Sequence, residues 1–211
     1  MTAAARFITF EGIEGVGKST QLRLLATALG ARGIDALLTR EPGGTPLAEK
    51  IRALVLEPGG EPLPPAAELL LIFAARAVHL HDRIEPALRA GRWVLCDRFT
   101  DATYAYQGAG RQLPAGAIGM LEQWVQGLRR PHLTILLDMP VAAALDRVRG
   151  RAAVTDRFES EHCEFFERVR QAYLARAAAE PRRIVVIDAA RAADEVGRSV
   201  LAAIEAESWI S

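Results

Sequence analysis

Residues 6–20 read RFITFEGIEGVGKST, an apolar run followed by a glycine-rich segment that contains a single lysine. The spacing G-x-x-x-x-G-K-S from residue 12 to residue 19 matches the phosphate-loop pattern, in which backbone N–H groups surround phosphate oxygens. Glycine suits such a loop because it adopts backbone angles that a Cβ disfavours and lets the chain approach an anion closely. Residues 20–29 have a helical pattern, and a helix N-terminus adds positive partial charge at the loop. We therefore expect a nucleoside triphosphate site at this junction.

Two side chains of the loop are predicted to act directly on the triphosphate and its metal. Lys18 is expected to contact the β- and γ-phosphates, and the hydroxyl of Ser19 is expected to bind Mg²⁺. The predicted triphosphate-binding residues of the segment are Gly12, Ile13, Glu14, Gly15, Val16, Gly17, Lys18, Ser19 and Thr20.

Composition limits the classes of protein that fit. The length of 211 residues suits one α/β domain over residues 1–211. Lys+Arg and Asp+Glu both number 26, so no overall positive field favours a nucleic-acid partner. Two cysteines do not form a disulfide framework, and the apolar runs are too short for a signal peptide or a membrane span. We expect a cytoplasmic protein without a membrane or nucleic-acid partner.

Apolar runs and helical patterns alternate along the chain. The expected strands are residues 6–10, 34–39, 92–97, 133–138 and 183–188. The expected helices are residues 47–56, 66–90, 118–127, 141–148 and 161–179, with a closing helix over 200–210. This alternation predicts an α/β fold of three layers, a five-stranded parallel sheet flanked by helices.

Three of the expected strands end in aspartate, at Asp97, Asp138 and Asp188. Ligands of open α/β sheets bind beyond the carboxyl ends of the strands, so these positions are candidates for chemistry. Asp97 is predicted as a second metal residue beside Ser19. For Asp138 and Asp188, a cap on the following loop and a functional role are both open.

A phosphate loop alone does not define the reaction. No Asn-Lys-x-Asp guanine motif occurs, and the strand that ends at Asp97 continues with Arg98 instead of the glutamate typical of a transporter or helicase ATPase. An arginine there suggests a second anion, because a guanidinium grips a phosphate in a bidentate way. Arg40, at the end of the second expected strand, and Arg76, on the long helix, are further candidates.

Five segments together resemble the bacterial thymidylate kinases, within the nucleoside monophosphate kinase family of P-loop proteins. They are FEGIEGVGKST (10–20), TREPGGTPLAEKIR (39–52), LLIFAARAVHL (70–80), CDRFTDATYAYQGAGR (96–111) and RVRGRAAVTDRFE (147–159). The resemblance implies an ATP- and Mg²⁺-dependent transferase that phosphorylates dTMP to dTDP for dTTP synthesis. It also implies a homodimer, for which the long helix 66–90 could supply the interface or could be core.

The resemblance also implies roles for single residues. Glu14 corresponds to an acidic residue at the sugar 3′-hydroxyl, and Arg98 and Arg40 to arginines on the monophosphate. Arg76 and Thr103 correspond to residues that read the thymine edge. Tyr106 corresponds to a tyrosine that disfavours a ribose 2′-hydroxyl, and Glu41–Pro42 to a cis peptide. The expected substrate-binding residues are Glu14, Arg40, Pro42, Ile72, Phe73, Arg76, Arg98, Thr103, Tyr106 and Gln107.

One position departs from the family pattern. Many relatives place a base-stacking phenylalanine four residues before the equivalent of Arg76, where this chain has Ile72, and Phe73 follows one step later. One step along a helix turns a side chain by about 100°, since a turn holds 3.6 residues. Either Phe73 stacks on the base, or Ile72 forms an apolar floor and Phe73 is core; the preference for dTMP over dUMP depends on this pocket.

The segment 147–158 is the expected lid. The loop interior IEGV has no basic residue, whereas the lid is rich in arginine, as in family members whose lid supplies the catalytic charge. Phosphoryl transfer depends on positioning and charge stabilisation, which lid arginines provide while helping to exclude water. Arg149 and Arg151 are expected at the transferred phosphate and Arg147 on the adenine. The predicted catalytic residues are Glu14, Lys18, Arg98, Arg149 and Arg151.

Two other functions stay open from the residues alone. A kinase for another pyrimidine monophosphate would need the same phosphate loop and acceptor arginines. A nucleotide-binding switch would use the loop without an acceptor, and the acceptor-side arginines argue against it.

Overall fold

The computed structural model describes residues 4–57, 63–149, 158 and 161–210. Its centre is a sheet of five parallel strands in the order β2-β3-β1-β4-β5, which confirms the predicted sheet. The strands are β1 (Phe7–Glu11), β2 (Ala36–Arg40), β3 (Trp93–Asp97), β4 (Leu133–Asp138) and β5 (Ile184–Asp188). Because β1 lies between β3 and β4, the loop after β1 and the end of β3 meet at one edge of the sheet.

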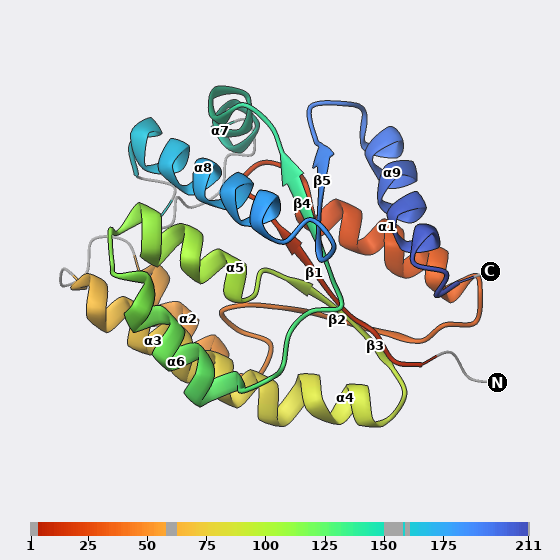
Figure 1. Cartoon of the computed structure of the whole chain (residues 1–211), viewed down its shortest axis with the longest axis horizontal. Coiled ribbons are helices and arrows are strands. Elements are labelled where there is room, and N and C mark those ends of the chain that lie inside the picture. Colours follow the sequence, from red (N-terminus) through yellow and green to blue (C-terminus); the bar gives the residue numbers. More distant parts are fainter. Residues whose placement is uncertain (1–3, 58–62, 150–157, 159–160, 211) are drawn as a thin grey trace.

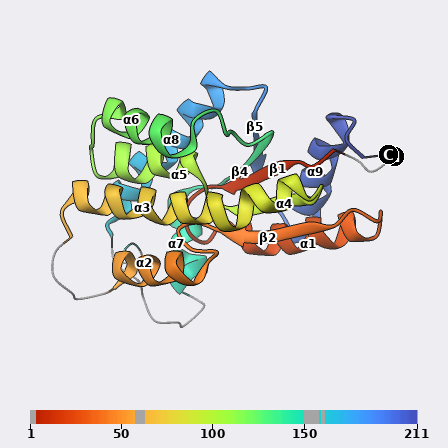
Figure 2. The same ribbon diagram turned by 90° about the horizontal axis from the view of Figure 1, so that it is seen from below.

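Helices cover both faces of the sheet (Figures 1 and 2). The α-helices are α1 (Lys18–Gly30), α2 (Pro46–Leu56), α3 (Pro65–His79), α4 (Glu85–Arg89), α5 (Thr100–Thr103), α6 (Ala115–Gln126), α7 (Val141–Arg149), α8 (Cys163–Ala179) and α9 (Ala193–Ala206). Two π-helical segments, η1 (Leu80–Ile84) and η2 (Tyr104–Gly110), continue α3 and α5. Helices α1 and α9 pack together on one face, and α4 and α8 lie on the other.

The alternation of side chains along β1 explains the two covered faces. Ile8 and Phe10 belong to the main core with Leu22 and Leu25 of α1, whereas Phe7 packs in a second cluster with Ile84 and its neighbours. All strand residues of β1 are buried. Burial on both sides accounts for the continuous apolar runs that predicted parallel strands.

Two helical predictions differ from the structure. The expected helix over 66–90 is divided by the π-helical turn η1, which keeps the chain helical from α3 into α4. The closing helix predicted over 200–210 is wrong in its bounds, because α9 begins at Ala193 and ends at Ala206. The start of α9 is fixed upstream, since the Glu195 carboxylate accepts the Ala192 N–H at 3.2 Å.

The segment α5–η2 was not predicted as helical. Its glycines concealed the pattern, and Gly110 is required by close packing: a Cβ there would lie 2.6 Å from the Phe165 ring of α8. Tertiary contact with α8 therefore overrides the weak helix propensity of this segment. Within the described ranges, no helix combines the length and apolar character needed to cross a bilayer.

Candidate active site

The loop between β1 and α1 has the backbone shape that its glycines predict. Gly12 and Gly15 have φ angles of 125° and 79°, which side-chain-bearing residues rarely adopt. A Cβ at Gly12 would overlap the Leu137 carbonyl oxygen, and one at Gly15 would overlap that of Ala144. The loop is thus fitted against the end of β4 and against α7, and only glycine fits at these two positions.

Lys18 begins α1 and folds back over the loop. Its Nζ donates to the carbonyl oxygens of Gly12 at 3.1 Å and Ile13 at 2.8 Å. Burial, and secondly the neighbouring charge of Arg98, lowers the pKa of Lys18 to about 8. A preorganised ammonium therefore lies inside the anion-binding loop.

Ser19 and Asp97 are brought together across the sheet edge. The Ser19 hydroxyl donates to Asp97 Oδ2 at 3.1 Å, joining the start of α1 to the end of β3. Hydroxyl and carboxylate oxygens are hard ligands of the kind that Mg²⁺ prefers, usually with water and substrate phosphates completing its shell. Among the described residues there is no cluster of three or more metal-ligating side chains of His, Cys, Asp or Glu. The pair fits Mg²⁺ held chiefly by a nucleotide.

Glu14 and Arg98 link the phosphate loop to an adjoining pocket, which both residues line. Arg98 Nη2 lies 2.8 Å from Glu14 Oε1, and the Tyr106 hydroxyl donates to Glu14 Oε2 at 2.7 Å. Arg98 has a left-handed φ of 68°, uncommon for a residue with a side chain. The next residue, Phe99, donates its backbone N–H to the Glu11 carboxylate at 2.7 Å. Burial raises the pKa of Glu11 to about 8.

Arg76 forms the inner end of the same pocket and is 1% exposed. Its Nε donates to Glu41 Oε2 at 2.7 Å and its Nη2 to Thr103 Oγ1 at 2.9 Å, while the buried Nη1 has no partner. Burial alone would raise the pKa of Glu41, but the Arg76 charge and a hydrogen bond from His79 hold it below its usual value. Buried polar atoms in folded proteins are nearly always hydrogen-bonded, so this unpaired nitrogen is an exception.

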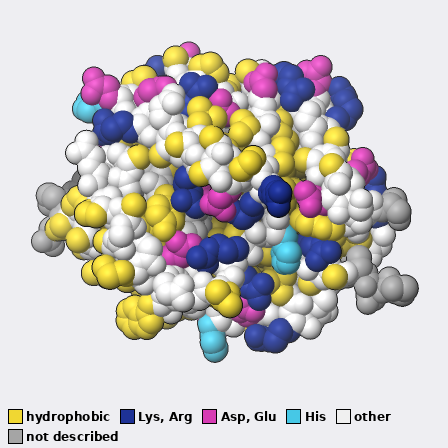
Figure 3. Space-filling model, in the orientation of Figure 1, with side chains coloured by type: hydrophobic (Ala, Val, Ile, Leu, Met, Phe, Trp, Pro, Cys, Tyr) yellow, Lys and Arg dark blue, Asp and Glu magenta, His cyan; other side chains and the backbone are white. Residues whose placement is uncertain are grey.

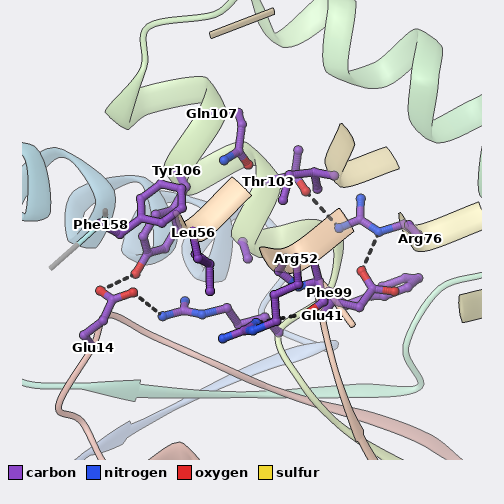
Figure 4. Close-up of a pocket in the computed structure, with 14 residues that line it drawn as sticks. Glu14, Glu41, Arg52, Leu56, Arg76, Phe99, Thr103, Tyr106, Gln107 and Phe158 are labelled. Atoms are coloured by element: carbon purple, nitrogen blue, oxygen red, sulfur yellow. Dashed lines mark hydrogen bonds and ion pairs between the residues drawn. The ribbon is translucent and has the colours of Figure 1, made fainter. Parts of the chain in front are cut away.

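The pocket collects residues from distant parts of the chain (Figure 4). Its lining consists of Glu14, Glu41, Pro42, Arg52, Leu56, Ile72, Arg76, Arg98, Phe99, Ala102, Thr103, Tyr106, Gln107 and Phe158. Eight of these were expected from the sequence, and the Glu41–Pro42 peptide is cis, as expected.

The structure separates the two alternatives at the apolar wall. Ile72 lines the pocket, whereas Phe73 packs in a core cluster with Leu69 and Ile118. The Phe73 ring also lies under Arg76, with Cζ 4.8 Å from the ring centroid. Phe73 thus supports the arginine from behind instead of facing the pocket, and the two neighbouring side chains point about 100° apart around the helix.

Arg40 is not among the pocket residues. It is about half exposed, pairs with Glu49 at 2.8 Å and lines a neighbouring hollow that also reaches Ser19 and Asp97. Its position at the exposed end of edge strand β2 accounts for the difference. Arg52 of α2 lies in the pocket instead, donating to the Pro42 carbonyl oxygen at 2.9 Å.

Several lining residues were missed in the sequence. Arg52 and Leu56 are four residues apart on α2, so they share a helix face, and that spacing could have indicated them. Phe99 and Ala102 belong to the unpredicted α5 region. Phe158 meets the Tyr106 ring edge-on at 5.6 Å between centroids, a contact that no local pattern indicates.

The predicted lid lies mostly outside the described residues, including Arg151. Arg149 is exposed and pairs with Asp146 at 3.2 Å. Arg147 donates to the carbonyl oxygens of Ala189 at 3.1 Å and Ala190 at 3.3 Å, beyond the end of β5. The start of the predicted lid is therefore the last turn of α7.

The two remaining strand-end aspartates have partners on α8 and in the turn after β5. Asp138 forms a bidentate pair with Arg170, at 2.7 and 2.8 Å. Asp188 accepts the Ala190 N–H at 2.9 Å and so caps the turn after β5.

Comparison with known proteins agrees with this geometry. The family model described as thymidylate kinase matches residues 10–200, which include the loop, the pocket and all strands after β1. This chain belongs to the thymidylate kinase family. It is 58% identical to the thymidylate kinase of Chromohalobacter salexigens over 198 residues, covering 93% of each chain. It is 55% identical to that of Alkalilimnicola ehrlichii over 191 residues, covering 90% of this chain and 88% of the relative.

A solved structure extends the similarity to the fold. The crystal structure of thymidylate kinase from Ehrlichia chaffeensis superposes with a TM-score of 0.77 at 33% sequence identity. The match covers 95% of this chain and 99% of that one. The five-stranded parallel sheet with its flanking helices is thus the fold of this family.

Proposed function

We propose that this protein transfers the γ-phosphate of ATP to dTMP, giving ADP and dTDP for dTTP synthesis. The observation that supports the proposal is the Glu14–Arg98 ion pair, which joins the phosphate loop to the adjoining pocket. Two anion-binding elements that share a boundary suit transfer between two phosphates. Membership of the thymidylate kinase family supports thymidine as the nucleoside.

The donor side is assigned to the loop. Lys18 stabilises the β- and γ-phosphates, and Ser19 and Asp97 hold Mg²⁺, which when bound neutralises charge on the transferred group. An oxygen of the dTMP phosphate forms the new bond to the γ-phosphorus as the bond to the ADP oxygen breaks. We assign Arg149 and Arg151 to the charge that develops in this step and Arg147 to the adenine.

The acceptor side is assigned to the pocket. Arg98 holds the dTMP phosphate, Glu14 contacts the sugar 3′-hydroxyl, and Tyr106 occupies the space of a ribose 2′-hydroxyl. Arg76, together with Thr103, reads the base edge. Ile72 and Pro42 supply apolar contacts to the nucleotide, and Gln107 reaches the base from η2.

The test of this function is direct. Purified protein is incubated with ATP, Mg²⁺ and, separately, dTMP, dUMP, dCMP and UMP, and the diphosphate products are quantified. We expect dTDP to form fastest and its formation to stop when Mg²⁺ is chelated. ATP binding without phosphorylation of any monophosphate would show a nucleotide-binding protein of another kind.

We also propose a homodimer that uses the exposed side of α6 and α3. Trp124 of α6 is 83% exposed, and Met120 of the same helix and Leu128 just after it are also exposed. Leu70 is exposed on α3, which packs against α6. Hydrophobic side chains gather over this part of the surface in Figure 3, and such patches on soluble proteins mark interaction sites. Seven of the 15 residues of α3, by contrast, are buried.

Sedimentation of the wild type and of Trp124→Glu tests the dimer. The wild type should sediment as a dimer and the variant as a monomer, while Leu24→Glu, at an exposed leucine of α1, should stay dimeric. A cytoplasmic location is proposed as well, because both Cys96 and Cys163 are free thiols.

A further inference from the structure

The side-chain amide of Gln107 lies at the inner end of the pocket, near Thr103 (Figure 4). It is 3% exposed, and its Nε2 donates to Glu68 Oε1 at 2.8 Å. Glu68 is a residue of α3 with no exposed surface. Arg111, at the end of η2, places its Nε 3.2 Å from Glu68 Oε2 and 3.5 Å from Oε1. One buried carboxylate therefore receives donors from both residues.

This contact fixes which way the amide faces. A carboxylate has only acceptor oxygens, so the amide nitrogen of Gln107 must face Glu68 and the amide oxygen must face away. In Figure 4 the oxygen lies on the side of Thr103. No described residue donates a hydrogen bond to this oxygen, although Gln107 itself is buried.

Arg76 lies at the same end of the pocket and is bonded to Thr103. Arg76 Nη1 is buried without a partner, because Glu41 and Thr103 take its other nitrogens. Arg76 thus brings a donor group to the pocket lining, and Gln107 brings an acceptor oxygen that no described residue bonds. Thymine has the complementary pair, the O4 acceptor beside the N3–H donor. Cytosine has the reverse pair, an amino donor beside an N3 acceptor.

We propose that Glu68 is a positioning residue that determines base specificity by holding the Gln107 amide with its oxygen toward the base. This inference rests on the proposed dTMP kinase function. The Gln107 oxygen accepts from N3–H of a 4-keto pyrimidine and meets the lone pair of a cytosine N3. Unpaired buried polar groups discriminate strongly, so a fixed amide excludes cytosine where a freely turning amide would adapt to it.

Glu68→Gln changes the orientation with little change of shape. The new amide at residue 68 must keep its oxygen toward Arg111, because a guanidinium only donates. Its nitrogen then faces Gln107, whose amide has to turn its oxygen toward residue 68 and its nitrogen into the pocket. The turned amide presents its N–H group to the base, where it faces the N3–H donor of thymine but can donate to the N3 acceptor of cytosine.

The kinetic test compares kcat/KM for dTMP and dCMP in the wild type and in Glu68→Gln. The ratio of the two values should fall by about tenfold or more, since a hydrogen bond to the base is lost for one substrate and gained for the other. Glu122→Gln is the matched control: Glu122 also accepts from a glutamine (Gln126, 3.4 Å) and an arginine (Arg130, 2.9 Å), but outside the pocket. A folded Glu68→Gln protein with an unchanged ratio would overturn the proposal.

A second measurement does not depend on the variant folding. Hydrogen exchange of the Gln107 side-chain amide, assigned in NMR spectra by its loss in Gln107→Leu, should be slow in the wild type because Nε2 is bonded to buried Glu68. Rapid exchange in the folded wild type contradicts the proposal. If the wild type phosphorylated no monophosphate but its Gln107 amide exchanged slowly, the proposed kinase function would be wrong while the Glu68–Gln107 contact would stand.

Discussion

Glu14 Oε1 and Arg98 Nη2 lie 2.8 Å apart, and this ion pair joins the phosphate loop to the end of β3. Arg98 Nη1 also donates to the Gly12 carbonyl oxygen at 2.8 Å and to the Tyr173 hydroxyl at 3.1 Å. A guanidinium has five N–H donors, so Nε and one Nη2 hydrogen have no partner among the described residues. Arg98 is thus held rigidly while it keeps donors for a phosphate.

Arg98→Ala should chiefly raise the KM for dTMP, because the lost contacts are made to the acceptor before transfer. Arg98→Lys should recover only part of the affinity, since an ammonium cannot keep the Glu14 pair and grip a phosphate with two parallel bonds. Initial rates over a range of dTMP concentrations at saturating ATP measure both. An unchanged KM in Arg98→Ala would remove the arginine from the phosphate site.

Arg149→Ala and Arg151→Ala should show the opposite kinetic pattern. We expect kcat to fall much more than ATP binding weakens, because these groups meet charge that develops during transfer. ATP affinity from equilibrium titration and kcat at saturation separate the two effects. If kcat stayed normal in both variants, the catalytic charge would have to come from another residue.

Lys18→Ala should remove most activity and leave the fold intact. Loss of one preorganised charge at the transferred phosphate costs about 3–4 kcal/mol of transition-state stabilisation, roughly a hundred- to thousandfold in rate. Circular dichroism and thermal unfolding would confirm that the variant is folded. Near-normal turnover would contradict the assignment of the loop.

The protonation of Lys18 also predicts a pH dependence. Burial and the charge of Arg98 lower its pKa to about 8, so the free enzyme loses this ammonium as the pH rises through that value. We expect kcat/KM for ATP to fall above about pH 8, whereas kcat at saturating ATP should fall at higher pH because bound phosphates favour the charged form. In Lys18→Arg the falling limb should disappear, since a guanidinium stays charged.

Local patterns in the sequence account for the sheet and for the phosphate loop. Both depend on contiguous residues, such as the run into Gly12 and Lys18, whose spacing has a direct physical meaning. The far wall of the pocket depends on tertiary packing. Phe158 reaches Tyr106 across the fold, and Ile72 rather than Phe73 faces the pocket because of the rotation of α3. Hydrophobic periodicity predicts neither contact, because it shows which face of a helix is apolar but not which part of the fold packs against that face.

The bounds of α9 and the helical segment α5–η2 were missed for a related reason. Gly108 and Gly110 weaken any helical pattern, yet close packing of η2 on α8 requires a small residue at Gly110. The cap at Ala192 uses a glutamate side chain three residues on, without a serine or threonine to mark the start. Local propensity is a weak guide where packing decides.

Asp101 should make stability sensitive to acid. Burial alone would raise the pKa of Asp101, but hydrogen bonds from Arg183 and the charge of Arg176 hold it below its usual value. A carboxylate whose pKa is lower in the folded than in the unfolded protein stabilises the fold at pH values above its unfolded-state pKa. This stabilisation is lost as the pH falls through the folded-state pKa. Asp101→Asn should therefore lose about 3–5 kcal/mol at pH 7, the cost of breaking a buried pair, and the difference from the wild type should shrink in acid.

Urea unfolding of both proteins from pH 7 down to pH 3 measures this difference. Asp194→Asn is the control, because Asp194 pairs with Arg198 at 3.0 Å on the exposed surface of α9. It should unfold like the wild type, since exposed pairs contribute little. A pH-independent difference for Asp101→Asn would show that the aspartate acts through shape and not through charge.

Tyr106 should select deoxyribose through its ring and position Glu14 through its hydroxyl. The ring packs edge-on against Phe158, Phe165 and Tyr173, so it cannot turn away from a 2′-hydroxyl, and the hydroxyl donates to Glu14 at 2.7 Å. Tyr106→Phe keeps the ring and loses the hydrogen bond, so kcat/KM for dTMP should fall while the preference for dUMP over UMP stays. Tyr106→Ala removes the ring, and that preference should fall by about tenfold, the scale of one or two apolar groups in a fitted pocket. Measuring kcat/KM for dUMP and UMP in both variants decides between the two roles, and an unchanged preference in a folded Tyr106→Ala protein would show that another residue excludes the 2′-hydroxyl.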